Sequence, residues 1–123
     1  MDALAFNMRG IRARTESGAM VTAVVKADAY GHGVEEVSRV VLENGADRLA
    51  VACISEAKQL RRAGIDAPIL ILGASDVSDA PEIVSNGIIP AVFSYNFASA
   101  LSDAGRAQGK NVKIHIKVDT GMS

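Results

Sequence analysis

The chain alternates between short apolar runs and stretches whose apolar residues keep helical spacing. The apolar runs predict strands at 20–27, 48–54, 68–73, 88–94 and 111–119. Only the last run alternates strictly between apolar and charged or polar residues. The other runs are nearly continuous, which is typical of strands that are buried on both faces of a parallel sheet.

The stretches between these runs have the apolar spacing of amphipathic helices. They predict helices at 2–15, 33–45, 55–64, 76–87 and 94–109. Each predicted strand is therefore preceded by a predicted helix. Such alternation indicates an α/β fold with a parallel sheet and right-handed crossovers.

Individual residues refine three of the predicted helices. In the first helix we expect Leu4, Met8 and Ile11 to face inward. Ser55 and Ser94 stand where two other helices should begin, and serine is a favoured N-cap residue.

Two architectures fit this order of elements. One is an open doubly wound sheet, and the other is part of a (β/α)₈ barrel. A whole barrel takes about 250 residues. The 123 residues with five predicted strands are therefore too few to close one.

Composition and charge exclude several classes of function. The chain is 49% hydrophobic and 22% charged, with a net charge of -1, so no basic surface indicates nucleic acid or an anionic membrane. It lacks an apolar run near the ~20 residues that span a bilayer, and its first residues do not resemble a signal peptide. We therefore expect a cytoplasmic protein, and we assign it no metal site.

The single cysteine, Cys53, excludes an internal disulfide. It lies within the apolar run at 48–54, so we expect it to pack in the core.

The first predicted strand ends in the stretch "AVVKADAYGHG", residues 23–33, which places Lys26 at the strand's carboxyl end. Parallel sheets bind ligands at this edge in both candidate architectures. A lysine amine that is partly shielded from water loses its proton more readily and can then act as a nucleophile. The alternative is a lysine whose stem packs at a strand end and that has no chemical role.

The residues after Lys26 favour a ligand site. Tyr30 can present a hydroxyl group, and Gly31 and Gly33 allow a tight turn before the next helix. We expect His32 to be a loop residue rather than a ligand-binding one. The chain has no G-x-G-x-x-G or Walker motif after any predicted strand, so a nucleotide site lacks its usual motif.

Four stretches of the chain resemble alanine racemases, which are bacterial enzymes that depend on pyridoxal 5′-phosphate. "VVKADAYGHG" resembles the family's cofactor-lysine motif, "DALAFNMRGIR" its first helix, and "IKVDTGM" its later K-x-D-T-G-M motif. The stretch "GADRLAVACISEAKQLRRAGIDAPILILG" is similar to the two intervening strand–helix units. The resemblance covers essentially all 123 residues in the family's order.

The resemblance implies a fold and a set of site residues. Residues 1–123 would form the N-terminal part of a TIM-type (β/α)₈ barrel, with about five of its eight strands. Lys26 would bind pyridoxal phosphate covalently and act as one of two catalytic bases, and Tyr30 would hydrogen-bond the phosphate. Val24 and Leu72 would pack around the cofactor ring, although core packing alone would select the same residues.

Lys117 belongs to the second motif, together with Asp119 and the residues up to Met122. The resemblance implies that it can be carbamylated, and that the carbamate orients an arginine. Independently, the alternation in 111–119 places Lys117 opposite the strand's apolar face. We expect its own face to be free of helices, unless this is simply a solvated face of an edge strand.

The family also has parts that do not occur among the 123 residues. These are the arginine partner of Lys117, the remaining barrel units and a β-rich C-terminal domain. In the homodimeric family that domain supplies the second base, a tyrosine, to the other subunit. We therefore expect these residues alone to be inactive as a racemase and marginally stable.

The resemblance implies interconversion of L- and D-alanine, which supplies D-alanine for peptidoglycan. A related serine or broad-specificity racemase remains an alternative, and a basic amino-acid decarboxylase fits the lysine motif less well. A non-catalytic pyridoxal-phosphate-binding module and an α/β domain without a cofactor are the alternatives of another class.

Overall fold

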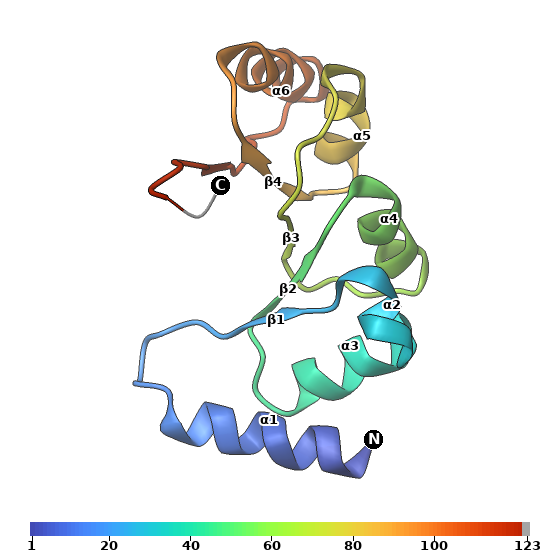
Figure 1. The fold of residues 1–123 in the computed structure, drawn as a ribbon. Helices are drawn as coiled ribbons and strands as arrows, with labels where there is room; N and C mark the ends of the chain where they lie inside the picture. Colours follow the sequence, from blue (N-terminus) through green and yellow to red (C-terminus); the bar gives the residue numbers. More distant parts are fainter. Residues whose placement is uncertain (122–123) are drawn as a thin grey trace.

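Five parallel strands form the centre of the structure, a computed structural model that describes residues 1–121 (Figure 1). The strands are β1 (Thr22–Val24), β2 (Arg48–Val51), β3 (Ile69–Ile71), β4 (Ile89–Val92) and β5 (His115–Ile116). Each strand pairs with its neighbour in the chain, and their order in the sheet is β1-β2-β3-β4-β5. A doubly wound sheet reverses its order at a switch point, so this sequential order excludes it. The fold is part of a (β/α)₈ barrel, as predicted.

The helices connect successive strands. They are α1 (Asp2–Arg14), α2 (Lys26–Gly31), α3 (Val34–Glu43), α4 (Ile54–Arg62), α5 (Ala80–Ser85) and α6 (Tyr95–Gln108), with a 3₁₀ turn, η1 (Val77–Asp79), before α5. Figure 1 shows α3, α4, α5 and α6 along one side of the row of strands. Right-handed crossovers between neighbouring parallel strands always return on the same side, which explains this arrangement.

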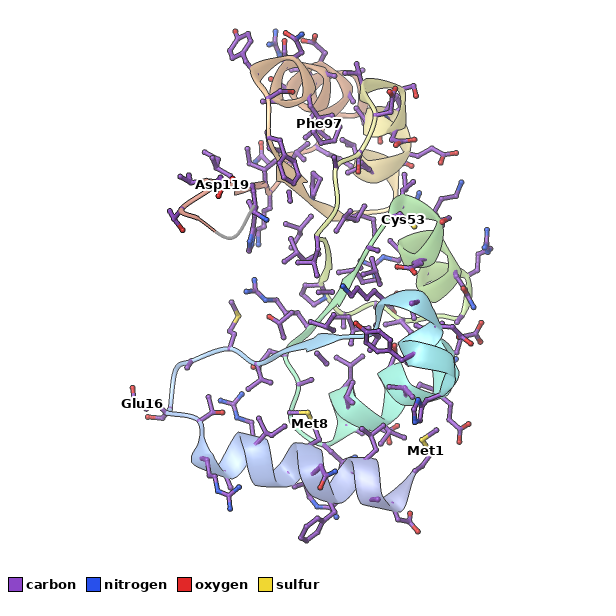
Figure 2. The ribbon with its side chains drawn as sticks, viewed as in Figure 1. Met1, Met8, Glu16, Cys53, Phe97 and Asp119 are labelled. Atoms are coloured by element: carbon purple, nitrogen blue, oxygen red, sulfur yellow. The ribbon has the colours of Figure 1, made fainter. Side chains whose placement is uncertain are left out.

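The core lies between the strands and these helices. Its members are buried apolar side chains from alternate strand positions and from the inner helix faces, including Val25, Leu49, Val51, Ile69, Ile71 and Val92 from the strand segments and Val37, Leu60, Ile83, Phe97 and Leu101 from the helices. In Figure 2 the labelled Phe97 lies on the side of α6 that faces the strands.

The intervening strand positions face away from the helices. We call this side of the sheet the open face, and its strand residues are Val24, Ala50, Leu70, Ala91 and His115, as the register shows. The neighbouring residues Val24 and Val25 illustrate the difference, because they are 49% and 2% exposed.

The predicted strands are all present, but the first and last predictions extend too far. β1 ends at Val24 because the chain turns into α2 at Lys26, whereas we predicted a strand to residue 27. β5 comprises only His115 and Ile116 of the predicted 111–119. Among the described residues β5 pairs only with β4, so it lacks the second ladder that would extend it.

The prediction for Cys53 was wrong. The connection between β2 and α4 is short, and Cys53 is the N-cap of α4 and is exposed. Helix α4 begins at Ile54, so Ser55 lies inside the first turn and is not the N-cap that we predicted. The sulfur of Cys53 lies 3.1 Å from the hydroxyl oxygen of Ser55.

The other cap prediction is confirmed, because the Ser94 hydroxyl accepts a hydrogen bond from the Phe97 N–H at 3.3 Å.

The predicted inner face of α1 is correct at Met8, which is buried, and Leu4 packs at the edge of the core. Ile11 is instead 53% exposed. Its place is taken by Arg12, whose guanidinium donates to Asp47 at 2.8 Å. The face of α1 that packs against the rest of the structure therefore runs through Leu4, Met8 and Arg12, which are spaced four residues apart.

Arg61 joins two of the connections at the amino edge of the sheet. Its guanidinium donates to the carbonyl oxygens of Ala67 at 2.9 Å, Asn86 at 3.0 Å and Gly87 at 3.3 Å. Partial burial lowers the pKa of Arg61 from its ordinary value, and the charge of Asp66 opposes this shift. The side chain thus links the loop before β3 to the loop before β4.

Replacing this guanidinium should destabilise the fold. We expect Arg61→Ala to lower the free energy of unfolding by about 2 kcal/mol, because several carbonyl groups lose a charged donor. The measurement is urea denaturation of the full-length protein. Arg62→Ala is the matched control, because Arg62 is the exposed neighbour and has no hydrogen bond of its side chain within residues 1–121. Equal midpoints for the two variants would contradict the role given to Arg61.

Two glycines inside helices should respond to alanine with opposite signs. A Cβ at Gly10 in α1 would meet no atom within 4 Å, so Gly10→Ala should raise the free energy of unfolding by about 0.5–1 kcal/mol. A Cβ at Gly105 in α6 would lie 2.8 Å from the Lys110 carbonyl oxygen and 2.9 Å from Val112. Gly105→Ala should therefore lower the free energy of unfolding by about 1–3 kcal/mol. Thermal denaturation measures both, and a shift of the same sign in the two variants would refute the packing described here.

Candidate functional site

Three of the predicted site residues follow strands at the carboxyl edge of the sheet. Lys26 begins α2 directly after the β1 segment, Leu72 follows β3, and Lys117 follows β5. Parallel strands end at the same edge, so the fold brings these residues to one side of the molecule. Lys26 itself is half-buried.

The backbone after Lys26 forms a left-handed turn. Ala27, Asp28, Ala29 and Tyr30 have φ values of 52° to 54°. Residues other than glycine rarely adopt this conformation, because the Cβ atom approaches the following carbonyl oxygen. The strand predicted as far as residue 27 is therefore wrong at its carboxyl end, where the turn replaces it. Strain of this kind is concentrated at functional sites.

Two carboxylates hold the left-handed turn at its ends. Glu56 accepts hydrogen bonds from the N–H groups of Ala27 at 2.8 Å and Ala52 at 2.7 Å. Asp28 accepts a hydrogen bond from the Val34 N–H, the first residue of α3, at 2.8 Å. The turn is thereby fixed to the ends of β2, α3 and α4.

Gly31 and Gly33 allow the chain to turn tightly before α3, as predicted. Their φ values are 86° and 87°, and Gly33 is the N-cap of α3. His32 lies between them and is exposed, and its Nδ1 atom is 3.1 Å from the Ala29 carbonyl oxygen. It is a turn residue, in agreement with the prediction.

Tyr30 and Val24 line the same hollow. Its volume is about 460 Å³, and it lies between α1 and the left-handed turn, with Leu4 and Asn7 on the α1 side. Tyr30 is 70% exposed. Its side chain is therefore accessible to a ligand in solution.

Leu72 and Val24 have similar surroundings. Leu72 is 38% exposed and continues the alternation of Leu70, so it belongs to the open face. Other residues of the same face are buried, since Ala50 and Leu70 are 0% and 7% exposed. A ligand role for Val24 and Leu72 therefore stays a prediction.

Lys117 directly follows β5 and is exposed, and it lines a hollow together with Tyr95 and Ala98 of α6. The expectation that its face is free of helices therefore stays a prediction. The N–H of Lys117 donates to the Val92 carbonyl oxygen at 2.9 Å, and the Lys117 amine is 5.7 Å from the centroid of the Phe93 ring. The apolar residues on the other face of this segment, Ile116 and Val118, are exposed. In the same motif Asp119 accepts from the Gly121 N–H, and Met122 lies outside the described residues.

Two kinds of site receive no support from residues 1–121. No helix in this part of the chain is both long enough and apolar enough to cross a membrane. Within the same range, no three histidine, cysteine, aspartate or glutamate side chains are grouped so that they could hold a metal ion.

Our sequence reasoning missed Glu56 and Asp28 as site residues. Glu56 stands three residues after the N-cap of α4, the spacing of a capping box. The signal was hidden because Cys53, which is not a typical capping residue, occupies the N-cap. Asp28 could have been suspected only from its place in the lysine motif.

Comparison with known proteins identifies the family. The family model described as "Alanine racemase, N-terminal domain" matches residues 1–123. Alanine racemase 1 of Clostridium acetobutylicum is 50% identical over 122 residues, which are 99% of this chain and 31% of that protein. The alanine racemase of Methanococcus maripaludis is 49% identical over 123 residues, covering 100% of this chain and 33% of that protein. The chain thus spans about a third of the length of these curated relatives.

Solved structures agree with the sequence comparison. The alanine racemase of Clostridium difficile 630 has a TM-score of 0.95 and 35% identity, covering 100% of this chain and 32% of that one. The alanine racemase of Bacillus anthracis with bound L-Ala-P has a TM-score of 0.90 and 39% identity, covering 99% of this chain and 31% of that one. Together with the lysine turn at the carboxyl edge of a partial barrel, these matches show that the chain belongs to the alanine racemase N-terminal domain family.

Proposed function

We propose that this chain is the cofactor-binding part of an alanine racemase that uses pyridoxal 5′-phosphate. The observation that carries the proposal is the placement of Lys26 at the start of a left-handed turn, at the carboxyl edge of a partial (β/α)₈ barrel. Family membership supports the same reaction, because the matched relatives are named alanine racemases.

The residues at this edge fit the chemistry of the cofactor. Lys26 offers an amine for a covalent bond to its aldehyde, and Tyr30 offers an accessible hydroxyl donor for its phosphate. Val24 and Leu72 offer partly exposed apolar side chains on the open face for its ring. When bound, the cofactor would withdraw electrons from the substrate's Cα and so make its proton removable.

Lys26 has two roles in this proposal. Its Nζ atom would hold the cofactor. The same atom would take the proton from one face of the substrate's Cα or return it there. The hydrogen bonds that hold the backbone after Lys26 would keep its amine near the same place in both roles.

Racemisation needs a second proton donor on the opposite face of Cα. We propose that a tyrosine outside these residues, from a β-rich domain of the partner subunit in a homodimer, supplies it. In this proposal residues 1–123 are the N-terminal part of the barrel domain. The share of the relatives that the chain spans, 31% to 33%, supports this division.

Lys117 is included in the proposal as a candidate for carbamylation. Its exposed position beside Phe93 leaves the amine accessible to carbon dioxide.

The proposed substrate is alanine. The Bacillus anthracis relative binds an alanine derivative according to its description, L-Ala-P, and this supports a small amino-acid pocket. We propose that the reaction takes place in the cytoplasm and that its product, D-alanine, is used for peptidoglycan.

Replacement of Lys26 tests the proposed function. We expect borohydride reduction of the full-length protein with pyridoxal phosphate to attach the cofactor to Lys26, as mass spectrometry of peptides would show. Lys26→Ala should abolish this attachment and lower alanine racemisation by roughly 10³-fold or more, because both the anchor and one base are lost. Lys58→Ala is the matched control, because Lys58 is a surface lysine that pairs with Glu82 at 2.7 Å.

The outcomes of this experiment separate the alternatives. Attachment at another lysine, or full activity in Lys26→Ala, would disprove the assignment. Attachment at Lys26 without any racemisation would favour a non-catalytic binding module. Faster racemisation of serine than of alanine would favour the related serine enzyme.

Removal of the Tyr30 hydroxyl should weaken cofactor binding selectively. We expect Tyr30→Phe to raise the dissociation constant of pyridoxal phosphate by roughly tenfold, the effect of losing one hydrogen bond to a charged group. Equilibrium titration of the full-length protein measures it. Tyr95→Phe is the control, because Tyr95 begins α6 and is exposed. An unchanged constant in Tyr30→Phe would remove Tyr30 from the phosphate site.

A further inference from the structure

We propose that Glu56 is a positioning residue for the cofactor lysine. In this inference, which rests on the proposed function, its carboxylate holds the left-handed turn in the conformation that directs Lys26 and Tyr30 to the cofactor. Glu56 lies in the first turn of α4 and does not belong to either motif that identified the family.

The contacts of Glu56 exceed what a helix cap requires. In a capping box the glutamate would bond to the N–H of the N-cap residue, here Cys53. Glu56 instead bonds to Ala52, before the cap, and to Ala27, which is 29 residues away in the sequence. The second bond cannot stabilise α4 locally, and its partner is the residue that directly follows Lys26.

The conformation of Ala27 gives this bond its importance. Ala27 is the first residue of the left-handed turn, with φ at 53° and ψ at 50°. An alanine in this conformation is disfavoured by about 1–2 kcal/mol, and the three residues after it share the same penalty. A charged acceptor at the first N–H group of the turn offsets part of this penalty where the turn begins.

Glu56 is also attached to a well-packed part of the structure. The neighbouring residues Ala57 and Leu60 of α4 are fully buried in the core, and Ala52 directly follows β2. Because α4 is packed in the core, the hydrogen bond from the Ala27 N–H to Glu56 fixes the backbone beside Lys26 relative to the core. Asp28 acts at the exit of the turn through the Val34 N–H, so the entry depends on Glu56.

The most informative substitution is Glu56→Gln. Glutamine has the same size, but only one of its two terminal groups accepts a hydrogen bond. The Ala27 and Ala52 N–H groups meet different oxygens of Glu56, so in this arrangement glutamine would leave one of them facing an NH₂ group. Glu82→Gln is the matched control, because Glu82 is an exposed glutamate in the first turn of α5 that pairs with Lys58.

The experiment uses the full-length protein and three readouts besides activity. These are the dissociation constant of pyridoxal phosphate, the pH midpoint of the visible absorbance of the cofactor bound to Lys26, and amide hydrogen exchange in peptides covering 26–33. We expect Glu56→Gln to raise the dissociation constant roughly tenfold, to shift the pH midpoint, and to speed exchange in 26–33. Exchange in α6 should not change, and Glu82→Gln should behave as the wild type.

A second variant protects the test against a general loss of stability. Glycine adopts positive φ without penalty, so Ala27→Gly should restore part of the cofactor affinity when it is combined with Glu56→Gln. A purely structural defect in α4 would not be relieved by a glycine at position 27.

Each outcome has a definite meaning. Wild-type cofactor affinity and pH midpoint in Glu56→Gln would overturn the positioning role and leave the proposed function intact. Equal losses in Glu56→Gln and Glu82→Gln would also overturn it, because a general charge effect would then explain both. If the wild type itself formed no bond to the cofactor at Lys26, the proposed function would fail, and this inference would fail with it.

Discussion

The left-handed turn from Ala27 to Tyr30 is the constraint on which the arrangement of the candidate site depends. Each of its residues is disfavoured by about 1–2 kcal/mol relative to a right-handed conformation, so the turn cannot persist on local preference. It is held by backbone hydrogen bonds and by the carboxylates of Glu56 and Asp28. Those carboxylates stand on or bind to helices whose inner faces are buried in the core. The packing of the core thus determines the conformation beside Lys26.

Because the connecting helices lie on one side of the sheet, the two faces of the sheet have different surroundings. Strand residues on the core face are buried against helices, and they stabilise the fold. Residues on the open face near the carboxyl edge, such as Val24 and Leu72, keep part of their surface accessible. Apolar surface that is left accessible beside an amine and a phenol is typical of a small-molecule site. The same parallel order therefore supports both the packing of the core and the geometry of the candidate site.

The sequence predicted the order of the helices and strands because apolar spacing is a local signal. The lysine motif indicated the candidate site, since residue types alone left Lys26 as an ordinary strand-end lysine. The sequence could not predict the left-handed turn, because alanine and tyrosine disfavour that conformation, and the hydrogen bond that holds the start of the turn comes from Glu56, 29 residues after Ala27. It failed at Cys53 for a related reason, since an apolar run does not mark where a strand ends and a helix begins.

Val24 and Val25 show why burial at this edge is decided by topology. The two residues are chemically identical and adjacent, yet one is 49% exposed and the other 2%. Alternation along a strand assigns them to opposite faces, and the sequential strand order places the helices that connect successive strands on the side of Val25. The face alone does not decide exposure, because Ala50 and Leu70 on the same side of the sheet are 0% and 7% exposed. Among the described residues β1 pairs only with β2, so the accessibility of Val24 next to the lysine turn follows from both its face and its place on an edge strand.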